Sequence, residues 1–415
     1  MSNPYAEIFR QPGTKGFSAA GFIARLPLPM TTIGIVAMLS QTHGEYWLAG
    51  AVSATFALAN AFIAPQVSRW VDRKGQSAVL APTVFITFLA LVGLAGAAWA
   101  ESPSWVLFVF ALIAGVMPSI GSMVRARWSE IYRGQSQLHT AFAFESVLDE
   151  LVYMAGPVFG IGLSVALFPE AGVLAAATFL AVGSTLFMVQ KSTEPTVGAQ
   201  QATRSGSVMR YPSMWFVVFV FIGIGMIFGT VEVAVIAFAQ AMGNKAAATY
   251  ILSLYAAGSC GIGLLFGAMS FKRSLASRLL IASVVALITT LPLPFVGNLW
   301  ILTLMVFVSG SIASPTFITG MSLIERIVPG AQLTEGITYA MTGVLIGFAA
   351  GSSVSGWMID TYGASNGFWG AVFGGVVAVA AMSAGYRRLF DLTREGPAQG
   401  VDPHAANQAA NQAAD

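Results

Sequence analysis

Three carboxylates open a long apolar stretch in the first half of the chain. The segment 139–168 reads HTAFAFESVLDELVYMAGPVFGIGLSVALF, with Glu145, Asp149 and Glu150 near its start. Nineteen residues without a charge follow Glu150, and at about 1.5 Å per residue a helix of that length covers the roughly 30 Å of a bilayer's hydrocarbon core. Glu145 and Asp149 are four residues apart and share a helix face. The pattern indicates charge that is handled inside a membrane.

Arg25 is the matching cation in the first apolar run of the chain. It lies about ten residues into that run, and Asp149 lies at a similar depth in its own run. We therefore expect an Arg25–Asp149 ion pair, in which Asp149 stays ionised while paired and becomes able to take a proton when Arg25 leaves. A static pair that only fixes the packing of two helices is an equal alternative.

The other embedded charges have several interpretations. Glu150 lies about 100° around the helix from Asp149, so the two acids cannot face one partner equally. Glu232, twenty residues into a later run, has no cation beside it in the sequence; it could titrate, bind a cationic substrate or make a structural hydrogen bond. Glu145 and Glu335 are closer to the predicted inner surface. There Glu145 is expected to meet an arginine after the fourth run, namely Arg125, Arg127 or Arg133.

The composition defines the class of protein. Hydrophobic residues make up 56% of the 415 residues and charged residues 9%, against roughly 45–50% and 25% in soluble domains. The net charge of +2 gives no basic face for nucleic acid. The single cysteine, Cys260, and three scattered histidines leave no metal-ligand spacing, so neither a metal nor a cofactor is expected. No nucleophile elbow, HExxH or phosphate loop indicates an enzyme.

The runs themselves predict an all-α membrane protein. Twelve stretches are long enough to span a bilayer. They fall at roughly 17–40, 47–68, 77–99, 104–125, 142–168, 170–190, 213–240, 247–270, 277–297, 299–323, 334–359 and 365–386. With the N-terminus inside, eighteen of the twenty Lys and Arg residues fall in inner segments. This bias predicts a multi-pass protein of the cytoplasmic membrane with both termini in the cytoplasm. Trp70, Trp128 and Trp215 are expected as interfacial anchors at the inner ends.

The longest polar break divides the spans into six and six. We expect an N-terminal six-helix bundle (1–190), a cytoplasmic linker (191–212), a C-terminal bundle (213–390) and a disordered tail (391–415). The break between the ninth and tenth spans has no charge and depends on Pro292, Pro294 and Gly297. Two repeats around a central site predict a pseudo-symmetric protein that rocks between inward-open and outward-open states.

With twelve spans in two halves, the chain resembles the major facilitator superfamily, and within it the twelve-span drug/proton antiporter-like branch. The resemblance covers residues 15–390. The segment Ser68-Arg69-Trp70-Val71-Asp72-Arg73-Lys74-Gly75-Gln76 is similar to the G-x-x-x-D-R-x-G-R-K signature. By this resemblance Asp72, at a helix terminus, and Arg73 latch the two halves across an inner gate. Gly156-Pro157-x-x-Gly160 is similar to the span-five motif of antiporters.

The sequence departs from the branch at four places. Ser68 replaces the first Gly of the gate signature and Gln76 replaces its later basic residue, and the span-five motif lacks a second Gly at Ile161. The branch's arginine in span four, four residues before a Gly, corresponds here to Ala111 before Gly115. Proton coupling through that arginine is therefore not expected, and other residues must do the work or the coupling differs.

The family analogy places a substrate cavity between the halves near mid-membrane. The residues expected to line it are Met30, Met117, Phe228, Tyr255, Phe307 and Phe317, although Met and aromatic residues at helical spacing are more often packing. The resemblance implies a monomeric secondary transporter whose partners are a small organic substrate, protons and the lipid bilayer. Proton-coupled efflux is the first hypothesis, and a proton-coupled importer of a nutrient or metabolite is the alternative. The alternative from a different class of protein is a membrane enzyme or a non-transporting receptor.

Overall fold

The computed structural model describes residues 3–43, 46–196, 206–269, 271 and 273–394 of the chain. Within these residues all regular structure is helical, and eleven helical segments are long and apolar enough to cross a membrane. A twelfth, Ser104–Ala114, is apolar but shorter, and a further helix continues its course. The prediction of an all-α membrane protein with twelve spans is confirmed. The predicted tail beyond Arg394 lies outside the described residues.

The first half of the chain supplies six spans. A short α1 (Pro4–Ile8) precedes them, and the spans are α2 with α3 (Thr14–Arg25 and Pro27–Thr42), α4 (Tyr46–Lys74), α5 (Gln76–Trp99), α6 with α7 (Ser104–Ala114 and Ile120–Tyr132), α8 (Gln137–Ala166) and α9 (Ala171–Val189). The 3-10 turn η1 (Lys191–Thr193) follows α9. We call the end of the bundle where η1 lies the linker end, and the opposite end the far end.

The second half repeats this plan. After the turn η2 (Val208–Arg210) come α10 (Pro212–Ala241), α11 (Lys245–Ala268), α12 (Leu275–Thr290), α13 with α14 (Leu299–Gly310 and Ala313–Ile327), α15 (Leu333–Tyr362) and α16 (Trp369–Arg394). The turns η3 (Leu293–Phe295), η4 (Gly330–Gln332) and η5 (Ala364–Phe368) lie between them. The fourth and tenth spans are both broken in the middle, as two related repeats would require.

Local sequence accounts for the helix ends. Pro27 and Pro212 stand in the first turn of α3 and α10, where a missing N–H costs nothing. The Asn298 side chain caps α13 by accepting from the Ile301 N–H at 2.8 Å. The predicted break between the ninth and tenth spans is present, because α12 ends at Thr290 and α13 begins at Leu299.

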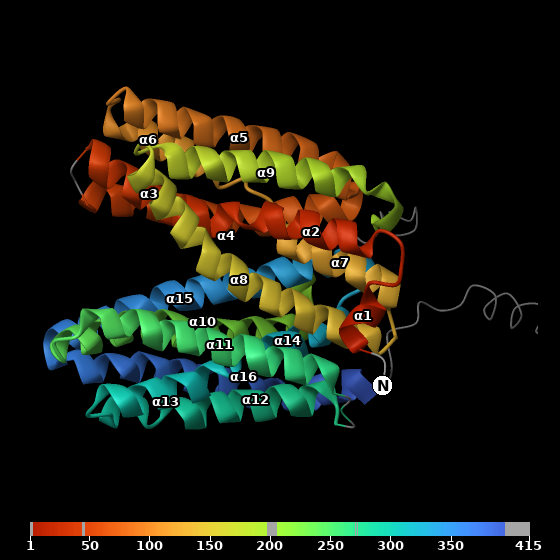
Figure 1. Cartoon of the computed structure of the whole chain (residues 1–415). Coiled ribbons are helices and arrows are strands. Elements are labelled where there is room, and N and C mark those ends of the chain that lie inside the picture. The colour runs from red at the N-terminus through yellow and green to blue at the C-terminus, as the bar shows by residue number, and fades with distance from the viewer. Residues whose placement is uncertain (1–2, 44–45, 197–205, 270, 272, 395–415) are drawn as a thin grey trace, which may run out of the picture.

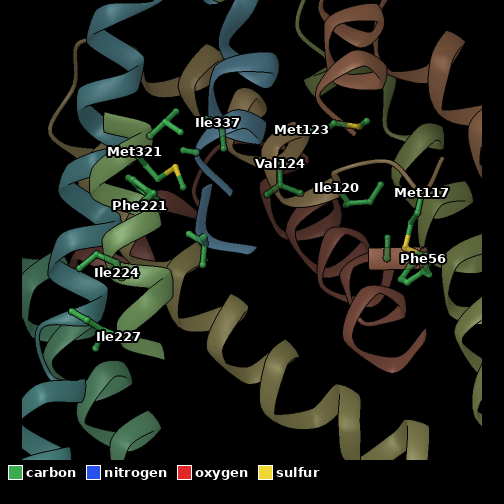
Figure 2. Packing of buried hydrophobic residues seen from close by; sticks show 14 of the residues in the cluster. Phe56, Met117, Ile120, Met123, Val124, Phe221, Ile224, Ile227, Met321 and Ile337 are labelled. Carbon is green, nitrogen blue, oxygen red and sulfur yellow. The ribbon is translucent and has the colours of Figure 1, made fainter. Parts of the chain in front are cut away.

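The helices form two bundles that lie side by side. Figure 1 shows the first six spans, coloured red to yellow-green, above the last six, coloured green to blue, with α8 crossing toward the second bundle. Buried apolar side chains pack inside both bundles: Figure 2 shows Phe56 and Met117 in the first bundle, and Phe221 and Met321 in the second. All four belong to one apolar cluster that runs through both bundles.

The two bundles are joined from the linker end to about mid-helix. Hydrogen bonds between them include those from Tyr5 and Thr140 to carbonyls of α11, and from Thr342 of α15 to the Ala61 carbonyl of α4. Among the described residues, none of these interbundle hydrogen bonds lies at the far end. The structure is therefore closed at the linker end.

Candidate functional site

Arg25 lies at the end of α2 and is 7% exposed. Its Nε donates to the Gly21 carbonyl of its own helix at 3.2 Å, which aims the rest of the guanidinium at α8. There Nη1 donates to Asp149 Oδ1 at 2.7 Å, and Nη2 pairs with Glu145 Oε2. One guanidinium thus bridges both acids that share the α8 face, with one charge-assisted hydrogen bond to each.

Arg125, on α7, is the second cation of this network. Its Nη2 donates to Asp149 Oδ2 at 2.5 Å, so Asp149 is held between two guanidiniums with one oxygen on each. Arg125 is 1% exposed. A buried charge of this kind persists only when paired and hydrogen-bonded. Two guanidiniums and the carboxylates of Asp149 and Glu145 make the network neutral.

Glu145 completes the network on the side of the linker end. Its Oε1 accepts from the Trp128 indole Nε1–H at 2.6 Å and from the Ser18 hydroxyl at 3.1 Å, and the side chain is fully buried. We expected Glu145 to meet an arginine at the end of span four, but it pairs with Arg25 on span one instead. Trp128 was expected as an interfacial anchor and is wholly buried, because its N–H serves this carboxylate.

The break in span four accounts for the position of Arg125, which was expected near the inner surface. Between α6 and α7 the chain leaves the helix at residues 115–119, and the Asn60 amide donates to the carbonyls of Gly115 and Met117 at 3.1 and 2.8 Å. The break redirects α7 so that Arg125 reaches the middle of α8. Span four therefore does bring an arginine to the acids, although Ala111 occupies the position where the branch motif has it. Gly121, one turn before Arg125, leaves room for the two guanidiniums, since a Cβ built on it would lie 3.4 Å from Arg125 Nη1 and 3.5 Å from Arg25 Cδ.

Glu150 is the one member of the acidic triplet that faces the other bundle. The Ser259 hydroxyl of α11 donates to Glu150 Oε1 at 2.7 Å, and it lies 2.9 Å from the Ser314 hydroxyl of α14. The expected divergence of Glu150 from Asp149 is present, since the two acids lie in different bonding environments. Ser259 and Ser314 escaped sequence reasoning because isolated serines in apolar spans are common.

Glu232 stands alone on α10. Its side chain is exposed, and among the described residues it makes neither a hydrogen bond nor an ion pair. It therefore does not join the network around Asp149. Glu335, by contrast, is buried at the linker end, where it accepts from the Ser207 hydroxyl at 2.6 Å.

Three of the six residues expected to line a cavity form one cluster. Phe228 of α10 meets the Tyr255 ring edge-on at 6.0 Å and lies parallel to the Phe317 ring at 5.9 Å. All three side chains are half-buried. Phe307 lies apart on α13 and is 39% exposed.

Met30 and Met117 differ from the expectation. Both are buried inside the first bundle, where Met30 packs with Leu26, Val152 and Ala176. Figure 2 likewise shows Met117 beside Phe56, within the first bundle. They serve packing because their spans press closely on neighbouring helices of the same half.

The predicted gate residues lie at the linker end. Asp72 accepts from the backbone N–H groups of Thr334 and Glu335, at 3.2 and 2.8 Å, where α15 begins. An acid at a helix N-terminus is stabilised by the helix dipole, and this contact joins the two bundles. Gly75 has a φ of +91° between α4 and α5, which favours glycine. Arg73, expected to cross the gate, is exposed and makes no ion pair with the described residues.

Ser68 strengthens the gate in place of the glycine of the family motif. Its hydroxyl lies 2.8 Å from the Thr338 hydroxyl of α15, which in turn lies 2.8 Å from the Ser122 hydroxyl of α7. Three hydroxyls thus connect the two bundles beside Asp72.

The predicted hinge motif is a close contact between α8 and α3. A Cβ built on Gly156 would lie 2.5 Å from Pro29, and one on Gly160 would lie 2.9 Å from the Met30 carbonyl oxygen. Pro157 stands within α8 and removes a backbone donor there. The glycines allow the two helices to approach within the first bundle, which places Arg25 against Asp149.

Two six-span helical bundles, one of which buries charged residues among its membrane helices, are typical of a transporter of the alternating-access type. The family model described as Major Facilitator Superfamily matches residues 17–307, and the chain belongs to that superfamily. It is a transporter and not an enzyme. No curated protein matched the sequence.

Solved structures of transporters share the fold. The human organic anion transporter MFSD10 superposes with a TM-score of 0.69 at 14% identity, over 90% of this chain and 100% of that one. The E. coli fucose:proton symporter FucP gives 0.67 at 14% identity, over 89% and 98%. A bacterial homologue of the iron transporter ferroportin, in an outward-facing state, gives 0.62 at 17% identity, over 88% and 99%. These likenesses concern the fold alone.

Proposed function

We propose that the protein moves a small organic compound across the cytoplasmic membrane by alternating access, coupled to protons, in the direction of efflux. Both termini are cytoplasmic in this proposal, and the chain works as a monomer. The bundles at 1–190 and 213–390 move as two bodies about the linker 191–212. The linker end then faces the cytoplasm, and the structure is the state closed to the cytoplasm.

The observation that carries this proposal is the charged centre on α8. Acids buried among helices of a membrane bundle are expensive and mark ion or proton pathways. Here the Asp149 pair with Arg25 and Arg125 lies within one half, whereas Glu150 contacts the other half. A change in protonation on α8 would thus alter both the packing of one bundle and its contact with the second.

The direction rests on the Gly156–Gly160 contact and the resemblance to antiporters. Antiport requires that substrate and proton exclude one another, whereas symport requires that they bind together. The same fold serves both, so the sign of proton movement is the decisive measurement.

A reconstitution experiment tests function and direction together. Compounds that raise the melting temperature of the detergent-purified protein are selected first, since specific ligands stabilise the folded state by mass action. Each is then added outside proteoliposomes that contain the pH-sensitive dye pyranine. Antiport predicts that entry of the compound makes the lumen more alkaline, because protons leave in exchange.

Two outcomes would contradict the proposal. Acidification of the lumen on entry of the compound would show symport and establish the importer alternative. Compound entry with no proton movement, unchanged by Asp149→Asn, would remove protons from the mechanism. Asp360→Asn, which removes an exposed carboxylate at the far end of α15, is the matched control.

A further inference from the structure

Glu150 differs from its two neighbours in having no cationic partner. Among the described residues no Lys or Arg nitrogen lies within 4.0 Å of it. Its Oε1 accepts from the neutral Ser259 hydroxyl, while Oε2 makes no hydrogen bond with the described residues. The side chain is half-buried rather than sealed. Glu150 is therefore both uncompensated and reachable.

The charges of the buried network balance without Glu150. The two guanidiniums of the network are matched by the carboxylates of Glu145 and Asp149. An ionised Glu150 adds one negative charge at mid-helix, next to lipid-embedded segments where such a charge is costly. Either a proton or a bound cation relieves that cost, and the two cannot occupy the carboxylate together.

The aromatic cluster lies within about one helical turn of the two serines at the Glu150 contact. Tyr255 precedes Ser259 by one turn on α11, and Phe317 follows Ser314 by three residues on α14. Phe228 packs against both rings from α10. A carboxylate beside partly exposed aromatic faces is the arrangement that proteins use to hold organic cations.

We propose that Glu150, Phe228, Tyr255 and Phe317 form the substrate site, and that its substrate is an apolar organic cation of single charge. This inference rests on the proposed transport function and specifies its substrate class. The carboxylate neutralises the cation, the rings cover its apolar groups, and a proton on Glu150 excludes it. Affinity for the cation is then lost as the pH falls and Glu150 takes up its proton.

The ionisable residues around Glu150 include one competitor for its role. On α8 the nearest ionisable residues are Asp149, already bridged by two arginines, and Tyr153; on α11 they are Tyr255 and Cys260. The ionisable residues of α14, Glu325 and Arg326, are about three turns from Ser314. On α10, Glu232 lies one turn beyond Phe228 and is the one competing carboxylate.

Binding of tetraphenylphosphonium to the detergent-purified full chain tests the site without requiring transport. Equilibrium dialysis is carried out in alkaline and in mildly acidic buffer. We expect binding by the wild type that weakens by about tenfold in acid, equivalent to about 1.4 kcal/mol. Glu150→Gln should bind about tenfold more weakly in alkaline buffer and show no pH dependence. Tyr255→Ala and Phe317→Ala should weaken binding and keep its pH dependence.

Ser259→Ala separates a binding role from a structural one. If the Glu150–Ser259 bond only joins the bundles, Ser259→Ala and Glu150→Gln should weaken binding equally, and the proposal fails. If Glu150 binds the cation, Ser259→Ala keeps the carboxylate and binds at least as tightly as wild type. Melting temperatures establish that each variant is folded, and Asp360→Asn is the control for removal of a carboxylate.

Other results overturn the proposal directly. Wild-type binding by Glu150→Gln, or loss in Glu232→Gln with none in Glu150→Gln, assigns the charge elsewhere. Proton-linked transport of neutral or anionic compounds, with no cation binding, sinks this inference and leaves the proposed function intact. Cation binding without proton movement in proteoliposomes leaves this inference intact and contradicts the proposed proton coupling.

Discussion

At the scale of single residues, the molecule concentrates four charges in one buried cluster. Asp149 divides its two oxygens between Arg25 and Arg125, and Glu145 accepts from Arg25 on one oxygen and from the Trp128 indole on the other. Breaking a buried pair by removing one partner leaves an uncompensated charge and costs far more than the pair itself contributes. The cluster is therefore sensitive to any change that alters its net charge.

Removing Asp149 alone should destabilise the protein strongly. Asp149→Asn leaves two guanidiniums against one carboxylate, at a cost of about 3–5 kcal/mol. The double variant Arg125→Gln with Asp149→Asn restores neutrality and should recover most of that loss. Chemical unfolding of the four proteins of this cycle in detergent measures the coupling. Additive losses in the double variant would mean that the ion pair is not coupled as described.

The sequence allowed some of this cluster to be predicted. Equal depths in spans one and five brought Arg25 and Asp149 together, because helical rise converts residue number into depth. Depth counting failed for Arg125, since it assumes a continuous helix and span four is broken at residues 115–119. It failed for Trp128 too: an aromatic near a helix end resembles an interfacial anchor unless its hydrogen-bond partner is known.

At the scale of helices, close backbone contacts set the positions of the charges. The contact between α3 and α8 depends on glycines of α8, because α3 lies so close that there is no room for a side chain at these positions. The motif was visible in the sequence as Gly156-Pro157-x-x-Gly160, yet its partner helix was not. Which face of a membrane helix meets which neighbour depends on packing that hydropathy does not encode.

Gly160→Ala should separate α3 from α8. The added methyl would lie 2.9 Å from the Met30 carbonyl oxygen, and backbone cannot give way there without moving a helix. We expect a loss of about 1–3 kcal/mol and weaker transport, because Arg25 shifts from Asp149. Gly162→Ala is the matched control on the same helix, since nothing lies within 4 Å of its added methyl. Equal melting temperatures for the two variants would refute the contact.

The break in span four should depend on Asn60. Its amide replaces helical hydrogen bonds for the Gly115 and Met117 carbonyls, and a buried acceptor left unsatisfied costs about 1–3 kcal/mol. Asn60→Ala is expected to lower stability by that amount. Asn366→Ala, which removes an exposed amide bonded to the Tyr362 carbonyl, should change it little. The melting temperatures of the two variants in detergent provide the comparison, and similar losses would contradict this role for Asn60.

At the scale of the whole molecule, the two bundles are held together at one end. The fourth and tenth spans are broken at equivalent places in the two halves, although the sequence predicted both as continuous. The state of the gate could not be predicted, because a chain that alternates between two arrangements has apolar runs that fit both.

Asp72→Asn should loosen the linker end. The amide keeps one acceptor and loses the charge that the N-terminus of α15 stabilises, an interaction of about 0.3–1 kcal/mol and up to about 2 kcal/mol when partly buried. We expect a larger population open at that end. Spin labels at Lys74→Cys and Arg388→Cys, in a Cys260→Ser background, report the distance between bundles. A distance distribution identical to that of Asp360→Asn would show that Asp72 does not hold the gate.

The hydroxyl chain of Ser68, Thr338 and Ser122 has a bearing on how easily the bundles part. A hydroxyl donates and accepts with equal ease and carries no charge, so water can rehydrate each of the three as they separate. Separation of the bundles leaves no ion of this hydroxyl chain unpaired in the hydrocarbon. The same contacts re-form when the bundles return. A serine where the family signature has glycine thus provides a contact that holds at rest and releases at small cost, once in every cycle.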